Sequence, residues 1–199
     1  MSAARTARTA RLARTALAAA AALALPVSGA TVATAATNAT TGLDGTWACS
    51  VPNGYVYDAV QQTRGCGSGS WTGPSFRLRT PVDGLVACST APGFVYDSVT
   101  GTTACDQLGR TPTTTYRLRV PVDGMTTCTT NPGWTYDLVT STFGCSQLSG
   151  VTATTYRIRV PSSGMWVCSV PNGWTFNATT SNTDCSGMRG VTATKFRLA

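Results

Sequence analysis

Eight cysteines carry the most constant spacing in the chain, and their pairing is the first chemistry that the sequence suggests. They form four pairs, each with its members 17 positions apart, while the residues between them vary. A disulfide within each repeat would preserve such a separation, although spacing alone leaves other connectivities open. Zinc is a weaker interpretation, because there is no histidine and no Cys-x-x-Cys pair. The expected disulfides are Cys49–Cys66, Cys88–Cys105, Cys128–Cys145 and Cys168–Cys185.

Catalytic groups are not evident in the sequence. The chain has no histidine and no glutamate, which excludes Ser-His-Asp and Cys-His arrangements. Asp44, Asp83 and Asp123 precede glycine in a turn, where aspartate serves backbone geometry. Most of the other aspartates recur at one place in successive repeats, whereas an active site seldom needs several copies. We expect a protein that is not an enzyme and that uses no cofactor and no metal.

Arginines alternate with apolar residues in a segment that closes each repeat, such as YRLRV at 116–120. The plain interpretation is a solvated strand face that keeps the protein soluble. The alternative is a repeated cationic surface that binds an anionic cell-surface polymer. Nucleic acid is not expected as a partner, because no aromatic residue alternates with the arginines along the strand. The arginines proposed to bind ligand are Arg117, Arg119, Arg157 and Arg159.

Tryptophans are the other candidate ligand-binding residues. Trp134 and Trp174 belong to aromatic pairs that recur in every repeat, so burial in a core competes with a role as stacking platforms for sugars. Two residues before the first cysteine of each repeat, by contrast, the sequence reads Trp, Val, Thr and Trp, which is typical of a surface position. Trp47 and Trp166 at that position, and Trp71, which is unique to repeat one, are therefore stronger candidates.

The elements that position these residues are four tandem repeats of about 40 residues. A motif with an alternating strand, a Pro and Gly turn and a second strand with a cysteine recurs as FRLRTPVDGLVAC, YRLRVPVDGMTTC and YRIRVPSSGMWVC. This pattern predicts a β-hairpin. In repeat three we expect strands over 125–130, 134–139, 142–147 and 154–160, and helix is not expected.

The repeats are too small to bury a core alone, so they must stack or act as disulfide-linked beads. The array begins in the second half of the hairpin motif and stops in the first half. If these two halves pair, the repeats close into a small propeller-like or barrel-like ring. Closure would also bring Trp47 and Trp166 together in one aromatic patch. We expect this all-β ring, with an open array of β-hairpin modules as the alternative.

The N-terminal region has the composition of a cleaved secretory signal. Four spaced arginines precede an apolar run and small residues, and the run is too short to span a bilayer. The predicted organisation is a signal peptide (1–35), a linker (36–42) and a β domain (43–199) with repeats 43–81, 82–121, 122–161 and 162–199. Without the signal arginines, eleven cations face eight aspartates, so the basic pI says little about nucleic acid.

Disulfide use behind an export signal predicts a secreted, extracellular protein with no membrane span. The function that we expect is multivalent, lectin-like binding of carbohydrate or of an anionic cell-surface polymer. One alternative is a secreted inhibitor or interaction module that presents the glycine-rich loop of repeat one (65–74) to a protein partner. Another is an extracellular structural or coat protein.

Overall fold

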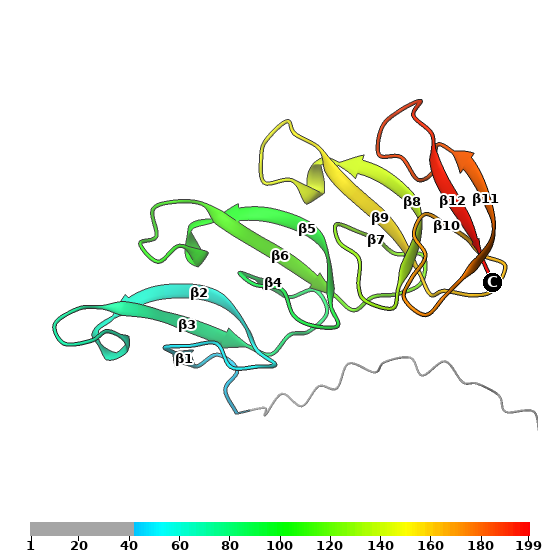
Figure 1. Ribbon diagram of the computed structural model, residues 1–199. Helices are drawn as coiled ribbons and strands as arrows, with labels where there is room; N and C mark the ends of the chain where they lie inside the picture. The colour runs from blue at the N-terminus through cyan, green and yellow to red at the C-terminus, as the bar shows by residue number, and fades with distance from the viewer. Residues whose placement is uncertain (1–41) are drawn as a thin grey trace, which may run out of the picture. The chain divides into compact units, whose positions relative to one another are not determined.

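The computed structural model describes residues 42–199, which form an all-β array of four three-stranded antiparallel sheets (Figure 1). The first two sheets contain β1 (Trp47–Ala48), β2 (Val56–Thr63), β3 (Gly73–Arg79), β4 (Val86–Ala87), β5 (Val95–Thr102) and β6 (Thr113–Arg119). The last two contain β7 (Thr126–Thr127), β8 (Thr135–Thr142), β9 (Ala153–Arg159), β10 (Trp166–Val167), β11 (Phe176–Asn182) and β12 (Ala193–Leu198). The expected signal peptide and linker lie outside the described residues, apart from Gly42.

In every sheet the arginine-bearing strand is central, as in the order β1-β3-β2. It pairs on one side with a two-residue strand that precedes the first cysteine, and on the other with the long strand that follows the cysteine. The apolar residue that follows the first arginine is fully buried in all four repeats, which shows which face of the strand points inward. These residues are Leu78, Leu118, Ile158 and Leu198.

The predicted hairpin is wrong. β6 does not turn back onto β7; it pairs with β4 of its own repeat, with Val86 opposite Arg117. Pro121 lacks a backbone N–H and ends the pairing, and the chain passes into the next repeat. There the N–H of Gly124, at a φ of +80°, donates to the carbonyl of Ile158 at 2.8 Å. The Asp-Gly turn therefore links two sheets and docks on the central strand of the following repeat.

The strand expected over 142–147 does not form. β8 runs on to Thr142, and a short 3₁₀ helix, η3 (Phe143–Cys145), follows it. The Thr142 side chain accepts a hydrogen bond from the Gly144 N–H at 3.3 Å, and such local capping competes with strand formation. The equivalent turns in repeats one and two are η1 (Arg64–Cys66) and η2 (Thr103–Cys105).

The four intra-repeat disulfides are confirmed: Cys49–Cys66, Cys88–Cys105, Cys128–Cys145 and Cys168–Cys185. Their Cα–Cα distances lie between 5.1 and 5.6 Å, and none of the eight cysteines is free. Each bond ties the residue after the short strand to the turn after the long strand. By the chain-entropy model, a loop of this length contributes roughly 3 kcal/mol to the free energy of unfolding.

The core is shared between neighbouring repeats. Val56 of repeat one is fully buried against Ala87, Ala91 and Leu118 of repeat two. Within each repeat, the ring that precedes the first arginine of the central strand packs edge-on against an aromatic residue of the long strand, with centroids 4.8 to 5.1 Å apart. These edge-to-face pairs contribute beyond their buried area and support the core interpretation of the repeated aromatics in repeats one to three, whereas Phe176 of repeat four is 50% exposed.

No pairing between the chain ends is present among residues 42–199. β1 pairs with β3 and β12 pairs with β10 and β11, so the first and last sheets are each complete without the other. Ring closure was expected because one predicted hairpin would be divided between the two chain ends. That hairpin does not form in any of the described repeats, so the reason to expect closure is removed. The strand pairing is compatible with the open array.

Candidate functional site

The arginines of the central strand are held by an aspartate at a β-bulge. In repeat three the register of β8 against β9 shifts between Tyr136 and Leu138, which leaves Asp137 as the extra residue. A bulge re-aims the side chain of that residue, and here it lies against the arginines. Asp137 Oδ1 accepts from Arg157 Nε at 2.7 Å, and Oδ2 accepts from Arg159 Nη1 at 2.9 Å.

The same cluster is built in repeats one and two. Asp58 binds Arg77 Nε at 2.6 Å and Arg79 Nη1 at 2.9 Å. Asp97 binds the two arginines of repeat two at the same distances. In each case the carboxylate is largely buried while the arginine side chains stay 30 to 48% exposed. The buried carboxylate binds both guanidinium groups and thereby holds the two arginine side chains in place.

The aspartate of the Asp-Gly turn completes the cluster. Asp83 Oδ1 accepts from the Val120 N–H at 2.9 Å and from Arg119 Nε at 2.9 Å. The hydrogen bond from the Val120 N–H is the largest cause that holds the pKa of Asp83 below its usual value, and the hydrogen bond from the Arg119 guanidinium is the next. Asp44 and Asp123 make the same two contacts in their repeats, and the backbone N–H bond again lowers the pKa of each carboxyl most.

These contacts change the electrostatic character of the predicted arginine surface. The proposed ligand-binding residues Arg117, Arg119, Arg157 and Arg159 all donate to carboxylates of their own repeat. Their charge is therefore balanced locally, and their remaining exposed N–H groups lie beside carboxylate oxygens. A surface of this kind presents hydrogen-bond donors and acceptors together, which suits a hydroxyl-rich ligand better than a simple polyanion.

Repeat four lacks both carboxylates and the second arginine of the cluster. Asn177 occupies the bulge, Ser163 replaces the turn aspartate and Ala199 replaces the second arginine. Arg197 remains, is exposed, and makes no ion pair within residues 42–199. It is the one central-strand arginine in the described part of the chain that is free to meet a carboxylate or phosphate of a ligand.

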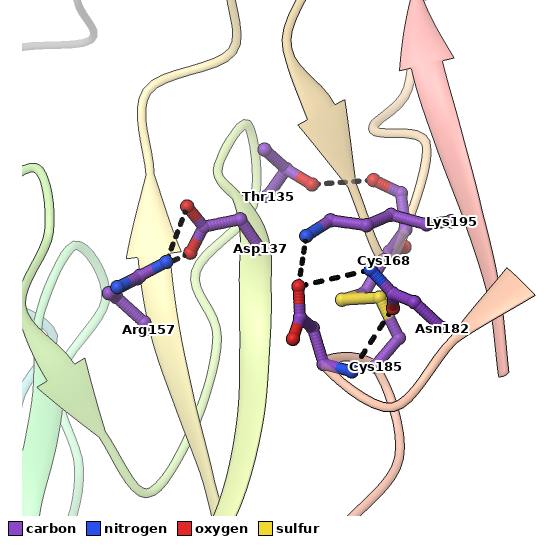
Figure 2. Close-up of a disulfide and its surroundings, with 9 residues drawn as sticks. Thr135, Asp137, Arg157, Cys168, Asn182, Cys185 and Lys195 are labelled. Carbon is purple, nitrogen blue, oxygen red and sulfur yellow. Dashed lines mark hydrogen bonds and ion pairs between the residues drawn. A yellow bond between two sulfur atoms is a disulfide. The ribbon is translucent and has the colours of Figure 1, made fainter. Parts of the chain in front are cut away.

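A second basic residue of repeat four is buried instead. Lys195 occupies the place that Thr115 and Thr155 hold in the preceding repeats, and its Nζ lies 2.8 Å from Asp184 Oδ2 (Figure 2). The hydrogen bond from Lys195 lowers the pKa of the Asp184 carboxyl. The Asn182 amide donates to the same carboxylate at 3.0 Å. Lys195 is thus used within the protein and is not available to a ligand.

Trp47 and Trp166 lie on the surface, directly across from arginines. In the register of β1 with β3, Trp47 is opposite Arg77, and in that of β10 with β12, Trp166 is opposite Arg197. Opposite residues of an antiparallel pair share one face of the sheet, so each tryptophan and the arginine opposite it project from the same face. The tryptophans are 43% and 36% exposed. The predicted union of both in one patch depended on ring closure and has no support in the strand pairing.

The remaining tryptophans fall into two groups. Trp134 and Trp174 are partly buried in the turn before the long strand, in keeping with their place in the repeated aromatic pattern. Trp71 is 79% exposed at the loop of repeat one. A side chain at Gly67 would collide with the backbone of Trp71, and one at Gly73 with the backbone of Cys66. The two ends of the loop therefore approach each other so closely that only glycine fits at both positions.

One cavity of about 350 Å³ lies between repeats two and three. It is lined by Thr90, Ala91, Phe94, Tyr96, Tyr116, Thr129 and Thr130. Rings and hydroxyl groups could accommodate a single sugar unit there. None of the predicted ligand-binding residues contributes to its lining, so it is separate from the tryptophan and arginine pairs.

Other classes of site find no support in the part of the chain that the structure describes. No group of three metal-ligating side chains occurs among residues 42–199. The same residues contain no helix that is long and apolar enough to cross a membrane.

Sequence reasoning singled out the arginines and tryptophans as candidates but missed the carboxylates that bind the arginines. A signal was present, because the bulge aspartate, the turn aspartate and the second arginine are all replaced in the same repeat. Comparison of the chain with known proteins gave no match to a family model, a curated protein or a solved structure.

Proposed function

We propose that this protein is a secreted, non-enzymatic binding protein that recognises a carbohydrate polymer through several sites on one chain. The observation that carries the proposal is the exposed tryptophan opposite an arginine in the first and last sheets. The four disulfides are consistent with an oxidising, extracellular environment. Several weak sites on one chain would give useful avidity for a repetitive polymer.

The chemistry of the pair suits a sugar ring. A pyranose presents a face of C–H bonds, which packs on the electron-rich face of an indole, while its hydroxyl groups need donors and acceptors at the rim. At Trp47 both are supplied, because Arg77 is fixed by Asp58 at 2.6 Å and keeps part of its guanidinium exposed. The carboxylate also holds the arginine side chain, which reduces the entropy lost on binding.

The two sites differ in charge, which predicts different preferences. Arg77 is neutralised by Asp58, so the site at Trp47 favours a neutral sugar. Arg197 has no carboxylate beside it within residues 42–199, so the site at Trp166 favours a sugar with a carboxylate or phosphate. Replacement of Asn177 by aspartate should reduce binding of the anionic sugar at repeat four and leave the neutral site unchanged.

The test is binding of the disulfide-intact protein to neutral and uronic-acid polysaccharides, measured by calorimetry and co-sedimentation. Trp47→Ala and Trp166→Ala should each weaken binding, and the double variant should lower affinity about 10-fold or more, as loss of a central aromatic contact does. Val86→Ala is the matched control, because Val86 is exposed at the same position of repeat two. Unchanged affinity in the double tryptophan variant would refute the proposal.

A second candidate function rests on Trp71. Its 79% exposure on a loop whose glycines are fixed by close backbone contacts favours insertion into a protein partner. A pull-down from culture medium with the protein and with Trp71→Ala distinguishes the two functions. Loss of one stoichiometric protein partner in the variant, with sugar binding intact, would favour this second candidate.

A further inference from the structure

Consecutive repeats dock on one another in the same way three times. The backbone N–H of the first cysteine donates to the carbonyl of a tyrosine in the preceding repeat: Cys88 to Tyr57, Cys128 to Tyr96 and Cys168 to Tyr136, each at 2.7 Å. The residue before each of these cysteines is buried by the contact. We call the incoming segment, from the short strand to the following turn, the docking segment; in repeat four it is 166–174.

The surface that receives the docking segment is the start of the long strand. The first buried residue of the long strand is Val56 in repeat one, Val95 in repeat two and Thr135 in repeat three. Each is no more than 1% exposed. Threonine is accommodated because its hydroxyl donates to the Ser169 carbonyl of the docking segment at 2.5 Å (Figure 2). We call this residue and the aromatic residue after it the receiving strand.

Both kinds of surface occur uncovered in the described array. In repeat four the receiving strand is Thr175 and Phe176, and both are exposed although their equivalents in the other repeats are not. In repeat one the docking segment is 47–55. Its Cys49 and Pro52 are exposed, whereas Pro171 at the same place in repeat four is buried.

The two uncovered surfaces match each other in sequence. The docking segment of repeat one reads WACSVPNGY, and that of repeat four reads WVCSVPNGW, identical at seven of nine positions. The receiving strand of repeat four follows Gly-Trp and reads Thr-Phe; that of repeat three also follows Gly-Trp and reads Thr-Tyr. A contact between repeat four and repeat one would therefore reproduce the contact between repeats three and four almost residue for residue.

We propose that the docking segment of repeat one binds the receiving strand of repeat four in a second copy of this chain, giving head-to-tail self-association. The Cys49 N–H donates to the Phe176 carbonyl, and the Thr175 hydroxyl donates to the Ser50 carbonyl. Such an interface joins two different surfaces, so each added copy presents a new receiving strand and the assembly can continue. Because repeat four has Asn177 where the other repeats have the bulge aspartate, this interface buries no carboxylate at that position.

The association is weaker than the contact inside the chain. Repeat four also contacts repeat three through its second loop, where the Val139 N–H donates to the Asp184 carbonyl at 2.7 Å and the Ser141 hydroxyl to the Gly187 carbonyl at 3.2 Å. The corresponding loop of repeat one is one residue shorter and cannot repeat both bonds in register. The assembly should therefore grow over about 1 µM to 1 mM protein, the range of weak interfaces.

Sedimentation velocity of the full, disulfide-intact chain tests the proposal. The wild type should show a mass that rises with concentration beyond the dimer. Thr175→Arg blocks the receiving strand and Pro52→Arg blocks the docking segment; both residues are exposed, so neither change disturbs the folded chain. Each variant alone should be monomeric, and an equimolar mixture should form dimers and nothing larger, because one intact surface of each kind remains.

Ser149→Arg, an exposed change in a loop of repeat three, is the matched control and should associate like the wild type. A wild type that stays monomeric up to about 1 mM overturns the proposal, as does a mixture that stays monomeric. Self-association that persists in both single variants also overturns it. Sugar binding does not enter this result, because the position of Trp47 and Trp166 stays exposed in the stacked repeats, as at Val86.

Discussion

Replacement of Asp137 by asparagine removes the carboxylate that joins two arginines of repeat three. Asp137 accepts from Arg157 at 2.7 and 3.0 Å and from Arg159 at 2.9 Å, and its side chain is 10% exposed. Asparagine has nearly the same shape but keeps one acceptor oxygen and no charge. The variant therefore tests the interaction without opening a cavity.

The expected loss lies between two limits. Removal of one partner from a fully buried ion pair costs about 3 to 5 kcal/mol, and exposed pairs contribute about 0 to 1 kcal/mol. Here the carboxylate is buried, but the arginine side chains are 42% and 29% exposed, and Arg159 keeps Asp123 at 3.1 Å. Water can thus solvate part of each guanidinium. We expect Asp137→Asn to lower the free energy of unfolding by about 1.5 to 3 kcal/mol.

Urea unfolding with the disulfides intact, followed by far-ultraviolet circular dichroism, measures this loss. A decrease of that size corresponds to a midpoint lower by about 1 M urea. Because a repeat array can unfold in stages, midpoints are compared and no single two-state free energy is assumed. Asp106→Asn is the control, since Asp106 binds the backbone N–H groups of Arg110 and Thr111 and contacts no arginine side chain. Equal midpoints for the two variants would refute the reasoning.

Three further predictions concern a disulfide, the turn aspartates and the Lys195–Asp184 ion pair. Replacement of both Cys128 and Cys145 by alanine should lower the free energy of unfolding by about 3 kcal/mol, seen as a lower urea midpoint, and mass spectrometry of non-reduced digests should recover the other three disulfides. The turn carboxyls, such as Asp83, have a pKa below 3.8, chiefly because each accepts a backbone N–H bond. Their contribution is present above the unfolded pKa and is lost as the pH falls through the folded one, so thermal melts should show stability decreasing below about pH 4. Asp184→Asn should destabilise the protein by about 1 to 3 kcal/mol, because it leaves the buried Lys195 without its counter-charge. Addition of Lys195→Thr should restore stability in a double-mutant cycle; if the two changes simply add, the pairing has no energetic role.

The features that sequence predicted well are those fixed by a local constraint within one repeat. A disulfide demands a defined geometry between two cysteines, so the spacing of Cys88 and Cys105 survives while the residues between them change. The buried strand residue is equally constrained, because Leu118 sits between two outward arginines in a period of two. Both signals can be read without knowledge of the strand partner.

Strand pairing could not be obtained in the same way. Alternation in 116–119 shows that a strand exists and which face is buried, but it is equally compatible with a partner before or after it in the chain. The Asp-Gly turn made the later partner attractive, whereas the backbone bond from Gly84 to the Leu118 carbonyl at 2.7 Å connects the strand to the earlier one. In a tandem repeat the phase at which one unit begins is ambiguous, and only the long-range hydrogen bonds resolve it.

The bulge aspartates show how comparison of repeats within one chain can reveal a set of interacting residues. Asp58, Asp97 and Asp137 each hold two arginines, and a carboxylate lost alone would leave two guanidinium groups side by side. Repeat four avoids this, because the second arginine is absent where the aspartate is absent. The coupled replacement marks the cluster as one energetic unit.

The same replacement separates two roles that the arginines combine elsewhere. In repeats one to three, the first arginine of the strand is both a structural partner of the bulge aspartate and a neighbour of the exposed position two residues before the cysteine. In repeat four Arg197 has lost the first role but keeps the second, opposite Trp166. Arg197 makes no ion pair within residues 42–199 and Trp166 is 36% exposed, so both side chains remain accessible to the anionic sugar proposed above. Loss of anionic sugar binding in Arg197→Ala, with an unchanged urea midpoint, is the result that this argument requires.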